Sequence, residues 1–226
     1  MDFWKWYAKN KDKLFWQKYR MAQGLDPDGG SIIQEKIHFK KMKKIREMAV
    51  NADNPHDAIV KSPIYDKQYF LKKWWNKMSL AEKETYLIHT WGNKIDGTLY
   101  GFNWWTPYFK ELGYITNCDE PKPTEPIILY RGIEPFFRAG MSWTDDVDMA
   151  QGFAESWDFI SDKYVYGMVV YPEQILGIIK GDAIDIHGRT QRNGLEYILE
   201  YETVKIEDIY EINDPKWNEH LKKYKE

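Results

Sequence analysis

The chain has 226 residues and a mass of 27.1 kDa, with 43% hydrophobic and 30% charged residues. It can bury one sizeable core and is too short for several full domains. Its 11 Trp and 16 Tyr residues exclude a disordered chain, and its apolar stretches are much shorter than the roughly 20 residues that a membrane-spanning helix needs. We therefore expect no membrane partner.

The expected location is the cytoplasm. The first residues carry charges where a secretory signal would hold its apolar segment. Cys118 is the single cysteine, so an internal disulfide is excluded and a reducing compartment is favoured.

Charge is unevenly distributed along the chain. The net charge of −3 argues against broad nucleic-acid binding, but residues 1–50 hold 12 Lys or Arg against 6 Asp or Glu, and the remainder carries −9. Tryptophans alternate with lysines near the amino terminus and could stack on nucleic acid. The same spacing also fits the buried side of a helix. A basic head thus precedes an acidic body.

Apolar residues recur at helical spacing in the first half of the chain. The predicted helices cover residues 3–21, 31–52, 65–77, 79–92 and 104–112. The pair Asn54-Pro55 ends the second, and Ser79 with Glu82 has the spacing of a capping box at the start of the fourth. The inward side of the second helix is expected to carry Ile33, Ile37, Met42, Ile45 and Ala49.

Beyond Pro126 the apolar runs become short and rich in β-branched or aromatic residues, which indicates strands. They cover residues 127–130, 141–143, 164–171, 175–179, 197–201 and 204–210. One helix interrupts them, opening at Thr144 or Asp145, and its buried side is expected to carry Val147, Ala150, Phe153 and Ala154. Helices first and a mostly antiparallel sheet afterwards predict the α+β fold class.

Common cofactor and metal motifs are missing from the sequence. The stretch from Asp26 to Gly30 lacks the glycine and the glutamate of a calcium loop at the required spacing. The five histidines are scattered, so we expect no metal site. No phosphate-binding loop, nucleophile elbow or dinucleotide fingerprint occurs.

Polar residues at strand ends form the remaining candidate site. Arg131 and Gly132 end one predicted strand, Ser142 and Thr144 flank Trp143 in the next, and Glu196 enters a later one. Ser142 and Thr144 point to the same side of a strand because they are two residues apart. Each residue alone has an ordinary structural explanation, so their order and context carry the argument.

That order resembles the Arg-Ser-Glu class of mono-ADP-ribosyltransferases, of the bacterial-toxin and phage type. The matching segments are Leu129-Tyr130-Arg131-Gly132, Gly140-Met141-Ser142-Trp143-Thr144, Ala150-Gln151-Gly152-Phe153-Ala154 and Gly194-Leu195-Glu196-Tyr197. The resemblance covers about residues 79–210. It implies an ADP-ribosyltransferase-like core of two packed, mostly antiparallel small sheets over 61–226. Residues 1–60 do not take part in the resemblance, and their charge and helical spacing predict a basic helical N-terminal extension.

The resemblance also implies the chemistry. NAD is the one cofactor required, consumed as a substrate, and ADP-ribose passes to a host protein or a nucleic-acid acceptor inside a bacterial cell, as with a phage or bacterial effector. Arg131 would bind phosphate or ribose oxygens, and Gly132 would let the backbone approach the nicotinamide carboxamide. Ser142 would orient Glu196 or the ribose, and Thr144 would support the fold beneath it. Glu196 is the expected catalytic carboxylate, which stabilises the positive charge that develops on the ribose.

The sequence does not identify the acceptor of ADP-ribose. Family members that modify arginine carry Glu or Gln two residues before the catalytic Glu, and Gly194 stands there. Gln191 and Arg192 lie where an acceptor loop is expected, although a solvated loop is an alternative. Trp157 and Phe159 could cover the nicotinamide or pack on the sheet. Two other functions remain: an NAD glycohydrolase with the same site, and a non-catalytic binding module whose basic head contacts nucleic acid or an acidic partner while the NAD site is vestigial.

Overall fold

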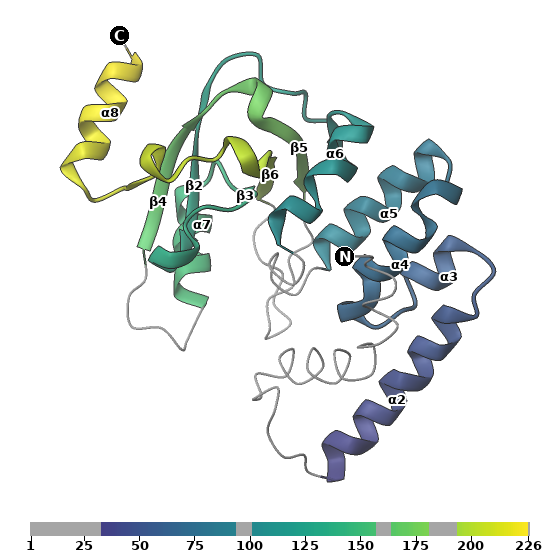
Figure 1. The fold of residues 1–226 in the computed structure, drawn as a ribbon. Coiled ribbons are helices and arrows are strands. Elements are labelled where there is room, and N and C mark those ends of the chain that lie inside the picture. The colour runs from purple at the N-terminus through teal and green to yellow at the C-terminus, as the bar shows by residue number, and fades with distance from the viewer. Residues whose placement is uncertain (1–32, 94–100, 157–163, 181–193, 226) are drawn as a thin grey trace. The chain divides into compact units, whose positions relative to one another are not determined.

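The computed structural model describes residues 33–93, 101–156, 164–180 and 194–225, and these ranges contain seven α-helices and seven strands (Figure 1). Internal contacts divide the chain into two compact units, Met1–Leu99 and Tyr100–Glu226. This division after Leu99 differs from the expected domain boundary after residue 60. The expected domain boundary stays a prediction. No helix among the described residues is long and apolar enough to cross a membrane.

The N-terminal unit is helical where it is described. It contains α2 (Ile33–Val50), α3 (Pro55–Ile59), α4 (Lys67–Trp74) and α5 (Leu80–Gly92), with 3-10 turns at Ile64–Asp66 and Trp75–Lys77. Its fully buried side chains come from α3, α4 and α5: Ala58, Ile59, Phe70, Leu71, Leu87 and Trp91. These elements confirm the helices expected over 31–52, 65–77 and 79–92, whereas the helix expected over 3–21 lies outside the described residues.

Local capping explains where two of these helices begin. The Asn54 side chain accepts a hydrogen bond from the Asp57 backbone N–H at 2.8 Å, so Asn54 caps α3, and Pro55 occupies its first turn. At α5 the Ser79 backbone N–H donates to Glu82 Oε2 at 2.8 Å, and the Glu82 N–H donates to Ser79 Oγ at 3.4 Å. The predicted capping box is therefore confirmed.

The buried side of α2 differs partly from the expected one. Ala49 is buried, and Met42 and Ile45 are half-buried, as the spacing predicted. Arg46 is also buried, and its Nε lies 2.9 Å from Asp66 Oδ2. The side chains of Ile33 and Ile37 lie outside the described set. A charged pair thus replaces part of the expected apolar contact, because Asp66 is present to neutralise Arg46.

The C-terminal unit contains the sheets. Its elements are η3 (Phe102–Trp104), α6 (Thr106–Leu112), β1 (Ile115–Thr116), β2 (Ile127–Ile133), η4 (Pro135–Phe137), β3 (Ser142–Trp143), α7 (Val147–Ser156), β4 (Tyr164–Val170), η5 (Pro172–Gln174), β5 (Ile175–Lys180), β6 (Leu195–Leu199), η6 (Tyr201–Thr203), η7 (Ile206–Asp208), β7 (Tyr210–Glu211) and α8 (Pro215–Lys225). Helices followed by strands confirm the α+β class.

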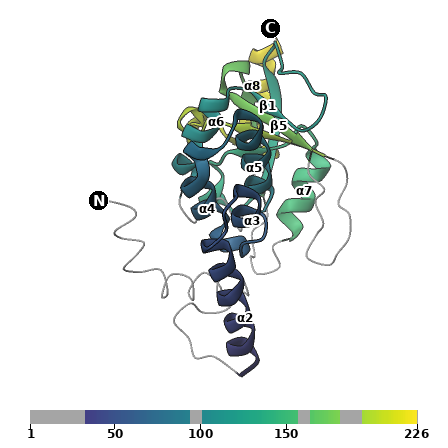
Figure 2. The ribbon, with the colours of Figure 1, turned by 90° about the vertical axis from the view of Figure 1, so that its right-hand side faces the viewer.

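Two small sheets form in this unit. One has the order β1-β5-β6-β3 and is mixed, because β1 runs parallel to β5 while the other neighbours are antiparallel. Figure 2 shows β1 beside β5. The second has the order β2-β4-β7 and is antiparallel. Both sheets contribute to one buried cluster: Leu129, Trp143, Tyr166, Met168, Val170, Ile175, Ile178, Tyr197, Leu199, Val204 and Ile209. The sheets therefore share one hydrophobic core.

Alternation along β2 decides which of its residues enter that core. Leu129 and Ile133 pack in the shared core, so Arg131, which lies between them, is on the same inner face. Tyr130 packs on the opposite face with Ala150 and Ala154 of α7. The helix α7 thus covers the outer face of the antiparallel sheet (Figure 1).

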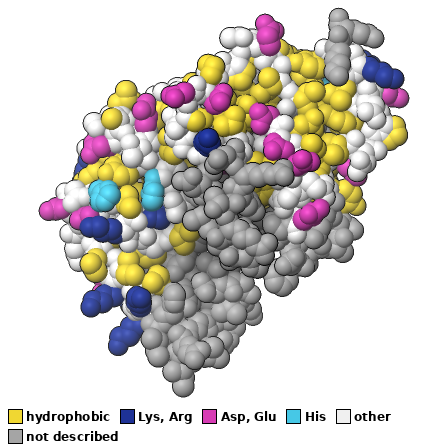
Figure 3. Space-filling model, turned by 180° about the vertical axis from the view of Figure 1, so that it is seen from behind, with side chains coloured by type: hydrophobic (Ala, Val, Ile, Leu, Met, Phe, Trp, Pro, Cys, Tyr) yellow, Lys and Arg dark blue, Asp and Glu magenta, His cyan; other side chains and the backbone are white. Residues whose placement is uncertain are grey.

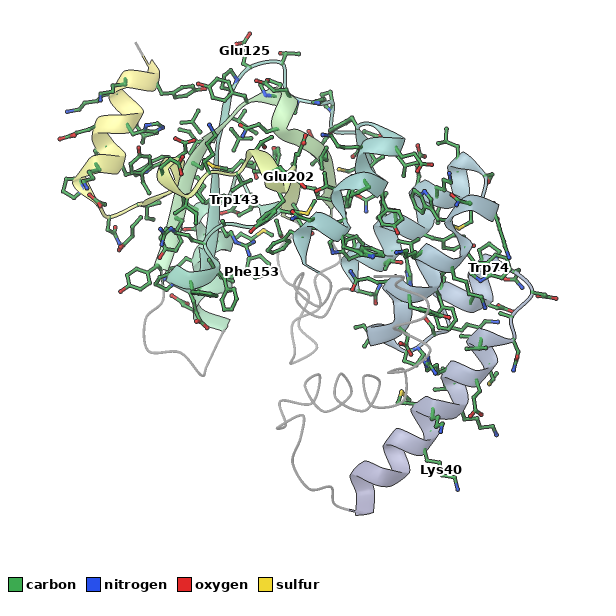
Figure 4. The ribbon with its side chains drawn as sticks, viewed as in Figure 1. Lys40, Trp74, Glu125, Trp143, Phe153 and Glu202 are labelled. Carbon is green, nitrogen blue, oxygen red and sulfur yellow. The ribbon has the colours of Figure 1, made fainter. Side chains whose placement is uncertain are left out.

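The expected buried side of α7 is right for its alanines and wrong for two other residues. Ala150 and Ala154 are buried, whereas Val147 is 39% and Phe153 38% exposed. Figure 4 shows Phe153 on α7 and Trp143 among the strands. Small residues face the sheet because the backbones approach closely: a Cβ built on Gly132 of β2 would lie 1.7 Å from the Ala150 carbonyl oxygen.

One strand prediction was wrong. Residues 204–210 form the 3-10 turn η7 and only the first residue of β7 instead of a continuous strand. Val204 and Ile209 are buried anchors of the core, and Ile206 between them is 52% exposed. An irregular segment that buries two β-branched side chains has the composition of a strand, so propensity alone could not separate the two. The short β1 and the helix α8 were not expected.

Candidate active site

The candidate residues lie where β2, β3 and β6 meet. A bridge joins the two sheets here: the Tyr130 N–H donates to the Thr144 carbonyl at 2.6 Å, and the Thr144 N–H donates to the Tyr130 carbonyl at 2.9 Å. Arg131 directly follows Tyr130, and Ser142 lies two residues before Thr144. The bridge therefore brings the end of β2 beside β3.

Strand register brings Ser142 and Glu196 together. Ser142 pairs with Ile198 and Trp143 with Tyr197 in the antiparallel β3–β6 ladder. Ile198 lies opposite Ser142, and Glu196 is two residues before Ile198 on β6. Glu196 therefore projects from the same face of β6 as Ile198, beside Ser142. The Ser142 hydroxyl donates a hydrogen bond to Glu196 Oε1. Two residues 54 positions apart in the sequence are in direct contact as a result.

Arg131 supports this pair from the inner face of β2. Its Nη1 donates to the Ser142 carbonyl oxygen at 2.5 Å. The guanidinium lies over Gly140, where a Cβ would be 2.8 Å from Nη2, so glycine at that position leaves room for it. Its Nε is buried and has no hydrogen-bond partner. One donor is thus engaged with the protein and another is unsatisfied.

Electrostatics link Arg131 to Glu196. Burial lowers the pKa of Arg131 to about 10, and the negative charge of Glu196 acts in the opposite direction. With that pKa, Arg131 remains a cation at neutral pH. The site therefore combines a positive guanidinium, a hydroxyl and a carboxylate.

Gly132 and Thr144 both connect the site to α7. Gly132 allows the close approach of α7 to β2, which gives this glycine a packing role beside the cofactor role expected from the resemblance. Thr144 is buried, and its Oγ1 accepts a hydrogen bond from the Asp146 N–H at 3.2 Å. Asp146 in turn accepts from the N–H groups of Asp148 and Met149, so it caps α7. Thr144 thus stabilises the turn that precedes α7.

Three site neighbours were not predicted. Tyr197 follows Glu196, and its hydroxyl donates to Asp145 Oδ2 at 3.1 Å. Burial, followed by the charge of Asp145, raises the pKa of Tyr197 well above its usual value. Besides Tyr197 and Asp145, the third neighbour is Met149 of α7. Its Sδ packs against Gly194, where an added Cβ would lie 1.9 Å from it. Each pair depends on two segments far apart in the chain, so no local pattern signals it.

The end of β6 is held at a second place. The Lys110 ammonium of α6 forms an ion pair with the Glu200 carboxylate, and the Glu200 N–H donates to the Gln174 carbonyl at 2.8 Å. The Gln174 side chain donates to the Thr203 carbonyl at 3.1 Å. The strand that carries Glu196 is therefore fixed at both ends.

Four expected residues lie outside the described ranges. They are Gln191 and Arg192 of the expected acceptor loop and the aromatic residues Trp157 and Phe159. In the parts that are described, no group of His, Cys, Asp and Glu side chains is arranged to hold a metal ion.

The arrangement can bind an anion and stabilise a developing cation in adjacent places. A charged guanidinium with an unsatisfied donor suits phosphate or another oxygen-rich anion. A carboxylate held by a hydroxyl suits a reaction whose transition state gains positive charge. Comparison of the chain with protein-family models, with curated proteins and with solved structures found no match.

Proposed function

We propose that the protein is a mono-ADP-ribosyltransferase that uses NAD as a substrate. In this reaction the bond between the nicotinamide nitrogen and the ribose C1′ breaks, and nicotinamide leaves with the electron pair. A nucleophile on a macromolecular acceptor then bonds to C1′ and loses a proton. The observation that carries the proposal is the contact between Ser142 and Glu196, with Arg131 bound to the backbone of Ser142.

Each residue of this cluster has a role that the proposed reaction needs. Glu196 would place a negative charge beside the ribose, where positive charge develops as the bond to nicotinamide breaks. Ser142 holds this carboxylate in one orientation and so reduces the rearrangement needed during the reaction. Arg131, with its charge and its unsatisfied donor, fits the pyrophosphate of NAD.

The test uses purified protein and labelled NAD in a bacterial lysate, with label on macromolecules and free ADP-ribose both followed. Glu196→Gln keeps the shape of the side chain and removes its charge, so turnover should fall by about 100-fold or more. NAD binding, measured by calorimetry, should change little. Glu207→Gln is the matched control, because Glu207 is exposed on η7 and no site residue contacts it in the described structure.

The products distinguish the related activities. Glu196-dependent label on a discrete protein or nucleic acid supports the transferase. Glu196-dependent free ADP-ribose without labelled macromolecules would replace it with an NAD glycohydrolase. If the wild-type protein consumes no NAD in the lysate, the enzymatic proposal fails.

A further inference from the structure

The two units of the chain carry opposite net charges. By sequence, Met1–Leu99 contains more Lys and Arg than Asp and Glu, and Tyr100–Glu226 contains the reverse excess. Part of the positive charge is concentrated on α2, where Lys40, Lys41, Lys43 and Lys44 are all exposed. Figure 3 shows Lys and Arg side chains gathered at the end of the N-terminal unit where α2 lies, and in Figure 4 Lys40 projects outward from that helix.

These four exposed lysines are called here the α2 lysine face. Helical spacing places Lys40 and Lys44 opposite the buried residues Arg46 and Ala49, while Lys41 and Lys43 flank them on either side. None of the four forms an ion pair with another described residue. Glu47 is the one acidic residue between Lys40 and Val50. The positive charge of this face is therefore presented to solvent with little local neutralisation.

The α2 lysine face does not help the helix to form. Lys40 lies three and four residues from Lys43 and Lys44, and Lys41 lies three residues from Lys44, so like charges are neighbours on the helix surface and repel. The last turn of α2 holds no basic residue, so these lysines do not stabilise the negative end of the helix dipole either. An external polyanion would relieve this repulsion.

We propose that the α2 lysine face binds the phosphate backbone of nucleic acid, without reading its sequence. Lys40 to Lys44 span about 6 Å of helix axis, and four charges in that length approach the density of duplex nucleic acid, roughly one charge per 1.7 Å. Lysine supplies point charges, which suit phosphates, and not the planar donor pairs with which arginine reads guanine. The acidic C-terminal unit is repelled by the same ligand, so only the N-terminal unit engages it.

A membrane surface fits this helix less well. A helix that lies in a bilayer interface needs an apolar face free to enter the lipid. Over the part of α2 whose side chains are described, that face is occupied, since Ala49 is buried and Met42 and Ile45 are half-buried within the N-terminal unit. The chemistry therefore favours an electrostatic ligand in water.

The experiment measures fluorescence anisotropy of short labelled DNA and RNA duplexes of random sequence with the full-length protein, without NAD. For four neutralised phosphates we expect a slope of log affinity against log salt of about −3.6, or roughly 100-fold weaker binding at 200 mM than at 50 mM salt. Changing all four lysines to Gln should abolish most of the binding and flatten this slope. Changing all four to Arg should preserve both, which separates loss of charge from loss of fold.

The matched control changes four exposed lysines of the C-terminal unit to Gln: Lys205, Lys216, Lys222 and Lys223. This control alters net charge equally and should leave binding unchanged. Equal loss in the control, no binding by the wild type, or unchanged binding by the α2 Gln variant would each overturn the proposal. Equal competition by poly-glutamate, or tighter binding to anionic lipid vesicles than to the duplexes, would also overturn it. Because NAD is absent, none of these results bears on the enzymatic proposal.

Discussion

The hydroxyl of Tyr197 donates a hydrogen bond to the carboxylate of Asp145 at 3.1 Å. Tyr197 directly follows Glu196 in β6, and Asp145 directly follows Thr144. Adjacent residues of a strand point to opposite faces, so this bond and the bond between Ser142 and Glu196 lie on opposite sides of β6. The strand is therefore tied to the region around β3 on both faces.

From this arrangement we predict that Tyr197 positions Glu196. Tyr197→Phe removes one hydrogen bond and should cost about 1 kcal/mol of unfolding free energy. If Tyr197 fixes Glu196, NAD turnover should fall by about 10-fold with KM for NAD unchanged. Steady-state kinetics and urea unfolding measure the two effects, with Tyr210→Phe of β7 as the control. Loss of stability with unchanged kcat would assign Tyr197 a structural role only.

Ser142→Ala tests the contact on the other face. A hydrogen bond to a charged group contributes about 1.5 to 3 kcal/mol, so kcat should fall by roughly 10-fold to 100-fold. Ser142→Thr retains a hydroxyl and should recover part of the loss. An alanine variant with wild-type kcat would mean that Glu196 is oriented without Ser142.

Gly132 and Gly152 provide a matched pair of glycines. A Cβ on Gly132 would lie 1.7 Å from the Ala150 carbonyl oxygen, whereas a Cβ on Gly152 of α7 meets nothing within 4 Å. Gly132→Ala should therefore destabilise the protein by about 3 kcal/mol or more, since backbone must move. Gly152→Ala should stabilise it by about 0.5 to 1 kcal/mol, because alanine favours a helix. Chemical denaturation gives both values, and equal effects would contradict the packing of α7 on β2.

For the buried pair Arg46 and Asp66, removing one charge should destabilise the protein more than removing both. The two residues are 7% and 1% exposed, so Arg46→Met removes the cation that lies 2.9 Å from the buried Asp66 carboxylate and should cost about 3 to 5 kcal/mol. The double variant with Asp66→Leu removes both charges and should regain most of that loss. Urea unfolding of the four proteins of this cycle measures the coupling, and additive losses would show that the pair is not the source of the cost.

The surroundings of His89 predict that the N-terminal unit becomes less stable toward unfolding at acidic pH. Its Nε2 lies 3.2 Å from Lys67 Nζ, which also donates to the carbonyl oxygens of Ile59 and Val60. Burial, and then the charge of Lys67, lower the pKa of His89 below 6.5. The unfolded chain therefore binds a proton more readily, so stability is full above about pH 6.5 and falls as the pH drops toward the folded pKa.

Thermal unfolding between about pH 7 and pH 5 measures this dependence, in the range where an ordinary histidine titrates. His89→Gln keeps an oxygen that can accept from Lys67 and removes the titration, so its unfolding temperature should depend less on pH. An equally steep dependence in that variant would show that other groups cause the acid sensitivity.

Features that depend on a few neighbouring residues were predictable from the sequence. The capping box of Ser79 and Glu82, the helices α2, α4 and α5, and most strands of the second half follow from caps and from hydrophobic periodicity. A family resemblance carried by Arg131, Ser142 and Glu196 also predicted the candidate site. Caps and periodicity are properties of short segments, so the sequence by itself determined the elements that they specify.

Other features were decided only when distant segments met. The contact between Ser142 and Glu196 requires the β3–β6 register, and the position of Arg131 depends on the bridge between Tyr130 and Thr144. Likewise, the core rather than local propensity decided that residues 204–210 form a turn between two buried anchors. The physical reason is that register, burial and electrostatic pairing depend on which surfaces pack together, and tertiary structure alone supplies that.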